Sequence, residues 1–229
     1  MNIKKNNQLT ILLSLGILAA VLLASSDYLM IYGDTTYESK LVWLTLGVAQ
    51  IPEERNAIAM LIAFIAIIFY CFGIFGVRHL FKDAKAAKNY TALSIVGLTP
   101  WLCLHLFYVM ILFNFAWLMH NTDSTIAYSL CEATFNQFAW LIPLAEVIML
   151  LPYVYIFVEI VRSKTNLTKI MAINNPILIF IVLKLISSLL PDIPFRLAFI
   201  NGLMSEAMIV WFLVYIIYIK KRGLESENQ

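Results

Sequence analysis

Long runs of apolar residues, separated by short polar stretches, make up most of this chain. A helix that spans a bilayer needs about 20 mostly apolar residues. Six segments reach that length: residues 9–32, 57–77, 91–119, 136–161, 170–190 and 195–219. The pattern therefore predicts an all-α fold, a polytopic transmembrane helical bundle of about six spans, forming a single integral membrane domain over residues 1–229.

Two further apolar stretches, residues 41–49 and 130–138, are too short to cross a bilayer. We expect each to lie at the outer interface or to re-enter the membrane. The first long segment follows Lys4 and Lys5, and its apolar run to Leu23 is followed by the small residues Ala24-Ser25-Ser26, as in a signal peptide. Its apolar run continues to Ile31, which is long enough to span, so we expect an uncleaved first helix.

The basic residues give this bundle an orientation, because cytoplasmic loops of membrane proteins are enriched in lysine and arginine. With six spans and the N-terminus inside, both termini are cytoplasmic, and twelve of the 16 basic residues fall on that side. These are Lys4, Lys5, Arg78, Lys82, Lys85, Lys88, Arg162, Lys164, Lys169, Lys220, Lys221 and Arg222. We therefore expect a multi-pass protein of the cell membrane.

Composition supports a lipid environment and excludes other classes of partner. The chain is 62% hydrophobic and only 13% charged, about half the charged fraction of a typical soluble domain. Its net charge of +2 gives no reason to expect a nucleic-acid partner. Cys71, Cys103 and Cys131 fall in separate segments without metal or disulfide spacing.

Several short motifs resemble those of a family of uncharacterised bacterial integral membrane proteins with six spans, a domain of unknown function. They are Asp27, Pro52-Glu53-Glu54-Arg55, Phe72-Gly73-Ile74-Phe75-Gly76, His105 and Asn201-Gly202. The resemblance covers most of the chain and implies a location in the bacterial cytoplasmic (inner) membrane. It implies no activity.

Polar residues inside the predicted spans are the candidate functional residues, because an ionised side chain at the bilayer centre costs about 2.5–3.5 kcal/mol on insertion scales. The candidates for binding a ligand or a proton are Asp27, His105, Glu146, Lys184, Asn201 and Glu206. They come from five of the six spans, each from a face that could point inward. We expect them to surround a central polar cavity that opens toward the outer side.

Two pairings follow from the depths of these residues. His105, Glu146 and Glu206 fall near the midplane, so His105 is predicted to point into the bundle near one of the two carboxylates. Lys184 falls in the outer half, at the depth of Asp27. An ion pair of Lys184 with Asp27 or Glu206 would remove the insertion cost of two charges, and we predict that pair.

Three functions remain open on these residues. The favoured one is small-molecule or proton-coupled transport, or ligand binding, with a small molecule, a proton or a lipid as the ligand beside the bilayer itself. The others are an intramembrane enzyme acting on a lipid, and a structural or accessory subunit whose polar residues only join helices. No sequence motif assigns a catalytic residue, and we expect no cofactor and no metal.

Overall fold

The computed structural model describes residues 3–36 and 39–227, with side chains described from residue 6 to residue 222 within those ranges. Five helices in this part are long and apolar enough to cross a membrane. They are α1 (Ile3–Ile31), α3 (Glu53–Gly76), α4 (Ala84–Asn121), α6 (Leu141–Val161) and α8 (Pro194–Glu227). The described residues contain no β-strand, only an isolated bridge between Phe81 and Thr165. The predicted all-α fold is confirmed.

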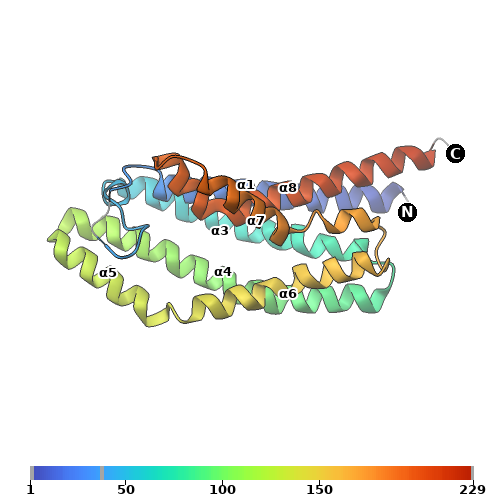
Figure 1. The fold of residues 1–229 in the computed structure, drawn as a ribbon, viewed down its shortest axis with the longest axis horizontal. Helices are drawn as coiled ribbons and strands as arrows, with labels where there is room; N and C mark the ends of the chain where they lie inside the picture. Colours follow the sequence, from blue (N-terminus) through green and yellow to red (C-terminus); the bar gives the residue numbers. More distant parts are fainter. Residues whose placement is uncertain (1–2, 37–38, 228–229) are drawn as a thin grey trace.

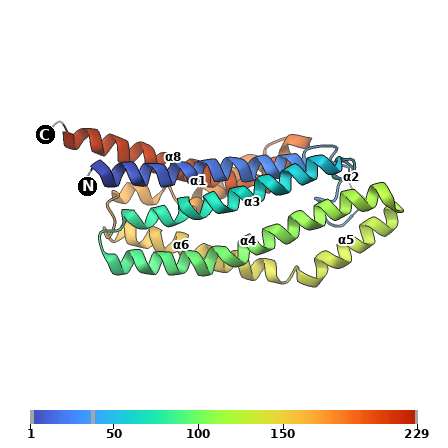
Figure 2. The same cartoon turned by 180° about the vertical axis from the view of Figure 1, so that it is seen from behind.

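Shorter elements connect these helices. They are α2 (Leu46–Ala49), the 3-10 turn η1 (Val77–Leu80), α5 (Ser124–Phe138), the 3-10 turn η2 (Lys169–Ala172) and α7 (Pro176–Ser188). The long helices lie lengthwise in an elongated bundle (Figure 1), and both chain ends lie at the same end of it (Figures 1 and 2). This placement fits an even number of crossings, with the segment that holds α7 as the sixth.

That sixth crossing is not the continuous helix predicted over residues 170–190. It is broken into η2 and the 13-residue α7, and α7 lies toward the end of the bundle far from the termini (Figure 1). Asn175 accepts a hydrogen bond from the amide of Ile177, and Pro176 has no amide hydrogen with which to extend a helix backward. Asn174 and Asn175 also donate to the carbonyls of Trp211 (3.2 Å) and Tyr153 (2.9 Å).

The predicted fourth span also begins later than expected. Residues 136–138 end α5, and α6 starts at Leu141 after a turn. The preceding helix α4 has 38 residues, about 57 Å at 1.5 Å per residue, which exceeds a hydrocarbon core of about 30 Å. We call the end of the bundle that lies far from the two chain termini its outer end. There the second half of α4 and the antiparallel α5 form a hairpin (Figure 1).

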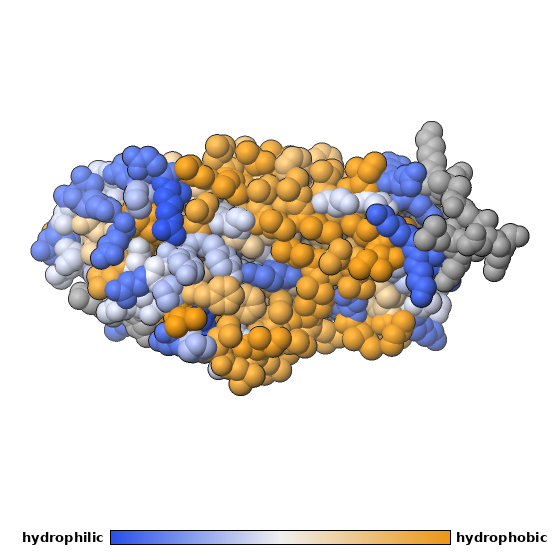
Figure 3. All heavy atoms as spheres, turned by 90° about the horizontal axis from the view of Figure 1, so that it is seen from above, coloured by the Kyte–Doolittle hydropathy of each residue, from blue (hydrophilic) through white to orange (hydrophobic). Residues whose placement is uncertain are grey.

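The surface shows how the bundle meets a bilayer. On the face seen in Figure 3, hydrophobic residues cover the middle of the molecule, and hydrophilic residues gather toward both ends. Many large apolar side chains on this surface are exposed in the single chain, among them Leu61, Phe64, Val147 and Leu185. Exposed apolar side chains in such numbers match a protein whose solvent is lipid.

Small residues set the close packing at the centre of the bundle. A β-carbon added to Gly16 of α1 would lie 2.9 Å from the Cα of Gly73 in α3 and 2.7 Å from a ring carbon of Phe212 in α8. Three helices therefore meet where only glycine leaves room. The face of α1 that contains Gly16 is therefore covered by α3 and α8.

The outer ends of α1 and α3 are tied together by polar contacts. The guanidinium of Arg55 donates to the carbonyl of Tyr28 (3.2 Å), in the last turn of α1, and to that of Tyr32 (3.0 Å), one residue beyond its end. Such carbonyls lack partners within their own helix. One turn closer to the middle, the hydroxyl of Ser26 donates to the carbonyl of Ala59 at 2.8 Å. The Pro52–Arg55 motif thus joins two helix ends.

The short apolar stretch 41–49 covers the outer end of the bundle from within the protein. Trp43, Leu44 and Val48 are buried in one apolar cluster with residues of α1, α4 and α5. The segment is anchored to α5 by Glu132, whose carboxylate accepts hydrogen bonds from the hydroxyl of Ser39 and the amide of Lys40. This cover and α5 together form one side of the cavity described next.

Candidate functional site

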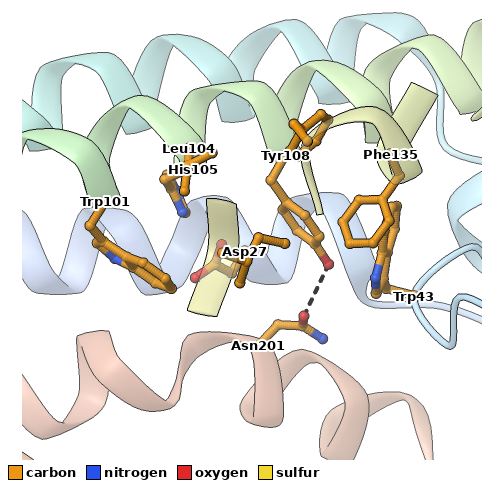
Figure 4. A pocket seen from close by; sticks show the side chains of 10 residues that line it. Asp27, Trp43, Trp101, Leu104, His105, Tyr108, Phe135 and Asn201 are labelled. Carbon is orange, nitrogen blue, oxygen red and sulfur yellow. Dashed lines mark hydrogen bonds between the residues drawn. The ribbon is translucent and has the colours of Figure 1, made fainter. Parts of the chain in front are cut away.

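A cavity of about 280 Å³ lies between the outer halves of the helices. Its lining comes from α1, the 41–49 segment, α4, α5, α6 and α8 (Figure 4). The lining residues are Asp27, Trp43, Trp101, Leu104, His105, Tyr108, Phe135, Phe138, Ile142 and Asn201. Three of the six predicted candidates, Asp27, His105 and Asn201, are therefore brought together.

Asp27 is the one acidic residue of this lining. It belongs to the last turns of α1, and its residue is only 4% exposed. No hydrogen bond or ion pair is formed by its carboxyl group with any residue that the structure describes. A buried carboxyl without a partner is unfavourable for stability, and it therefore marks a place where binding could compensate.

His105 projects from α4 toward Asp27, with a ring nitrogen pointing into the cavity (Figure 4). Its Nε2 atom is buried and has no hydrogen-bond partner among the described residues. His105 points into the bundle as predicted, but the carboxyl group with which it shares the cavity is that of Asp27, not that of Glu146 or Glu206. A neutral imidazole can donate at one nitrogen and accept at the other, so this atom can serve a bound molecule in either role.

Asn201 is held in place by two hydrogen bonds. The hydroxyl of Tyr108 on α4 donates to its Oδ1 at 3.1 Å, and its Nδ2 donates to the carbonyl of Leu197 at 2.8 Å. The first bond joins α4 to α8 across the cavity (Figure 4). The second lone pair of Oδ1 remains able to accept from a ligand.

Packed aromatic rings form the outer wall of the cavity. The ring of Trp43 lies 4.7 Å from that of Tyr108 and 5.1 Å from that of Phe135, measured between centroids. Phe135 in turn packs edge-on against Phe138 at 5.4 Å. Such contacts fix ring positions, so the wall is formed before any ligand enters.

Glu206, a further candidate, lies deeper on α8 and does not line the cavity. Its charge interacts with that of Asp27, so the two carboxyl groups are neighbours. A β-carbon on Gly202 would lie 2.7 Å from Oε1 of Glu206, which shows that this side chain folds back over Gly202. Its Oε2 is buried without a hydrogen-bond partner among the described residues.

Glu146 and Lys184 are on the outside of the bundle instead of in the cavity. Both residues are exposed in the single chain, so the central cavity predicted from five spans receives polar residues from α1, α4 and α8 only. The predicted ion pair of Lys184 with Asp27 or Glu206 is wrong, since the ion pairs among described residues are Arg162–Glu159 and Arg196–Asp192.

The physical reason for this error is a wrong face assignment on α7. Ser187 is buried, but Lys184 is three residues earlier on a short helix whose exposed residues also include Leu185 and Ile186. A lysine in that place can extend its apolar stem along the helix and bring its ammonium to the membrane interface. Ser187 and Ser188 donate to carbonyls of their own helix, at 2.7 Å each.

The aromatic residues of the outer wall were missed by sequence reasoning. Trp43, Phe135 and Phe138 lie in the two apolar stretches that are too short to span. The sequence predicts that these stretches lie at the interface or re-enter the membrane, but not which of their side chains point into the bundle. A signal was present, because aromatic residues in short re-entrant segments have no membrane-belt role to explain them. Only the packing of the 41–49 segment and α5 against α4 shows that they line the same cavity as Asp27.

Among the residues whose side chains the structure describes, no three or more histidine, cysteine, aspartate or glutamate residues form a group that could hold a metal ion. The cavity offers one carboxylate, one imidazole, one amide and several aromatic faces. This set can hold a small molecule that has a polar head and an apolar body.

Comparisons with known proteins place the chain in a family without indicating an activity. A family model described as a family of unknown function (DUF6796) matches residues 1–222. No curated protein and no solved structure gives a significant match.

Proposed function

The chain belongs to this family of unknown function, and from that premise we propose that it is a small-molecule-binding protein of the bacterial cytoplasmic membrane that carries its ligand in exchange with protons. The observation that carries the proposal is the cavity lined by Asp27, which has a packed aromatic wall and contains polar groups without hydrogen-bond partners among the described residues. Binding sites in proteins are typically concave and mostly apolar, with a few convergent polar groups.

The proposed orientation places both termini in the cytoplasm and the cavity in the outer half of the membrane. The basic residues between α3 and α4 and after α6 support it, as does the position of both chain ends at one end of the bundle. The side chains of Lys4 and Lys5 lie outside the described residues. A periplasm-dependent reporter fused after Gln229 should be inactive, and the same reporter inserted between Thr122 and Asp123 should be active.

The broken crossing formed by η2 and α7 supports transport over static binding. Secondary transporters commonly contain discontinuous helices, and η2 with α7 forms a crossing of that kind, although neither element lines the cavity. The pair Asp27 and Glu206 would take up and release the proton, since neither carboxyl is in an ion pair among the described residues and Oε2 of Glu206 has no hydrogen-bond partner there. No hydrogen bond joins any two of Asp27, His105 and Glu206 where the structure describes them, so an acid–base pair for lipid chemistry has no support.

Binding can be tested by filling the cavity. The purified protein would be titrated in detergent with three probes of similar shape and different charge: 2-phenylethylammonium, 2-phenylethanol and phenylacetate. At least one probe should raise the melting temperature, because a ligand that binds only the folded state stabilises it. Leu104→Trp places an indole in the cavity and should remove the effect, whereas Leu106→Trp, on the exposed side of α4, should retain it.

A wild-type protein that none of the three probes stabilises would contradict the binding function. Equal loss in Leu104→Trp and Leu106→Trp would show that the effect is not located in the cavity. Transport would then be tested in proteoliposomes containing a pH-sensitive dye. Uptake of the bound probe should change the internal pH, and Glu206→Gln should uncouple the proton movement from uptake.

A further inference from the structure

We infer that the cavity selects a small protonated amine, with the ammonium head on Asp27 and the apolar body against the aromatic wall. This inference rests on the proposed binding function and specifies its ligand. Three independent properties of the cavity support it: its charge, its aromatic rings and its hydrogen-bond acceptors.

The charge of the cavity lacks a counter-ion. Asp27 lines the cavity, and Glu206 is the neighbouring acidic residue, deeper on α8. A bound cation would stabilise the ionised form of Asp27. No lysine or arginine lines the cavity, and neither carboxylate forms an ion pair among residues with described side chains. In a medium of low dielectric constant, such a site attracts a cation and repels an anion.

The rings are arranged as cation hosts usually are. Trp43, Trp101 and Tyr108 line the same cavity as Asp27 (Figure 4). A cation within about 6 Å of an aromatic centroid is attracted by the electron-rich ring face, and tryptophan is the strongest host. The Trp43–Tyr108 contact of 4.7 Å keeps two of these rings in place without a ligand.

The polar groups then distinguish among cations. A protonated primary amine has three N–H donors. Asp27 offers a carboxylate, Asn201 offers the free lone pair of its Oδ1, and His105 offers an unpartnered ring nitrogen. A hard metal ion would need about six oxygen ligands, more than the cavity holds. A quaternary ammonium ion has no N–H group and would leave these acceptors unused.

Size limits the ligand further. The cavity of about 280 Å³ is at the lower end of the range for small-molecule pockets, which is about 300–1,000 Å³. An amine with one aromatic ring or a short alkyl chain fits this space. Leu104, Phe138 and Ile142 supply the apolar surface for that body.

The test compares affinities of the purified full-length protein by isothermal titration. We expect 2-phenylethylammonium to bind at least about tenfold more tightly than 2-phenylethanol, which corresponds to one charge-assisted hydrogen bond. Asp27→Asn should remove that advantage and leave 2-phenylethanol binding within about twofold. Asp34→Asn changes an exposed acid outside the cavity in the same way and should leave both affinities unchanged.

The outcomes separate this inference from the function on which it rests. If 2-phenylethanol or phenylacetate binds as tightly as 2-phenylethylammonium, the cavity binds small molecules but does not select amines. Tighter binding of tetramethylammonium would overturn the role of the N–H acceptors. If Asp27→Asn retains the full preference for the ammonium probe, the assigned counter-ion is wrong. Absence of binding by every probe overturns the binding function itself.

Discussion

Tyr108 on α4 donates a hydrogen bond of 3.1 Å to Oδ1 of Asn201 on α8, and this bond closes the polar side of the cavity. We expect Tyr108→Phe to destabilise the protein by about 1 kcal/mol, the typical net value of a neutral hydrogen bond. Tyr32→Phe, at an exposed residue, is the control. Thermal unfolding of Tyr108→Phe, Asn201→Ala and the double variant should give non-additive losses, whereas additive losses would contradict the contact.

Glu132 is expected to hold the outer wall together. Glu132→Ala removes the acceptor for Ser39 and for the amide of Lys40, so the 41–49 segment should separate more readily from α5. Hydrogen bonds to a charged group contribute about 1.5–3 kcal/mol. Amide hydrogen exchange at Lys40 and Leu41 should increase in Glu132→Ala, while Glu54→Ala, another exposed outer acid, should leave it unchanged.

The contact between Gly16 and Gly73 predicts a severe effect of adding volume. Gly73→Leu forces a side chain against the backbone of α1 and the ring of Phe212. Overpacking of this kind typically costs about 1–3 kcal/mol. Phe72→Leu changes the exposed neighbour and should be tolerated. Equal melting temperatures for the two variants would show that α1 and α3 are not in close contact at these glycines.

Lys184 should contribute little to stability, although its position in a predicted span indicates a buried ion pair. Lys184→Met removes a charge that has no ion pair among the described residues, so we expect a change within about 0.5 kcal/mol. Asn175→Ala on the same helix removes the cap of α7 and a buried bond to Tyr153. It should cost more than 1 kcal/mol, on the order of a lost buried hydrogen bond. A large loss in Lys184→Met would indicate an acidic partner within the membrane.

Asp83 should make the inner end of the bundle sensitive to acid. It caps α4, and hydrogen bonds from the amides of Ala86 and Lys85 lower its pKa below the usual value of 3.8. A lowered folded-state pKa means that the charge stabilises α4 above pH 3.8 and that this contribution is lost as the pH falls through the folded value. The melting temperatures of wild type and Asp83→Asn should therefore differ at pH 6. The difference should shrink as the pH falls below 3.8 and through the folded-state pKa of Asp83.

Hydrophobic runs predict most of this fold because a bilayer allows few alternatives. A backbone in lipid must satisfy its own hydrogen bonds, so apolar runs of sufficient length become helices, as α1, α3, α4, α6 and α8 do. The break before α7 was missed because apolar content continues through residues 170–173. The local indication of the break is Asn174-Asn175-Pro176, because asparagine followed by proline is typical of the start of a new helix.

The site was harder to predict than the fold. A rare charged residue in a span is a candidate functional residue, but its rarity does not tell which way its side chain points. Asp27, His105 and Asn201 do share a cavity, whereas Glu146 and Lys184 face outward. Helical spacing alone does not say which face of a lipid-embedded helix is inside, since both faces are apolar. The rotation of α6 and α7 is decided by packing, as where Gly97 of α4 meets Pro152 of α6.

The packing of α1 against α8 also bears on how the protein is made. Asp27 and Gly16 enter the membrane with the first helix, but Asn201 and Phe212 belong to the last. At about 5–20 residues per second, synthesis leaves α1 without α8 for roughly ten seconds to half a minute. During this interval the carboxyl of Asp27 faces lipid or the insertion machinery. Until α8 is made, Asp27 therefore lacks the residues of the last helix with which it shares the cavity in the finished bundle.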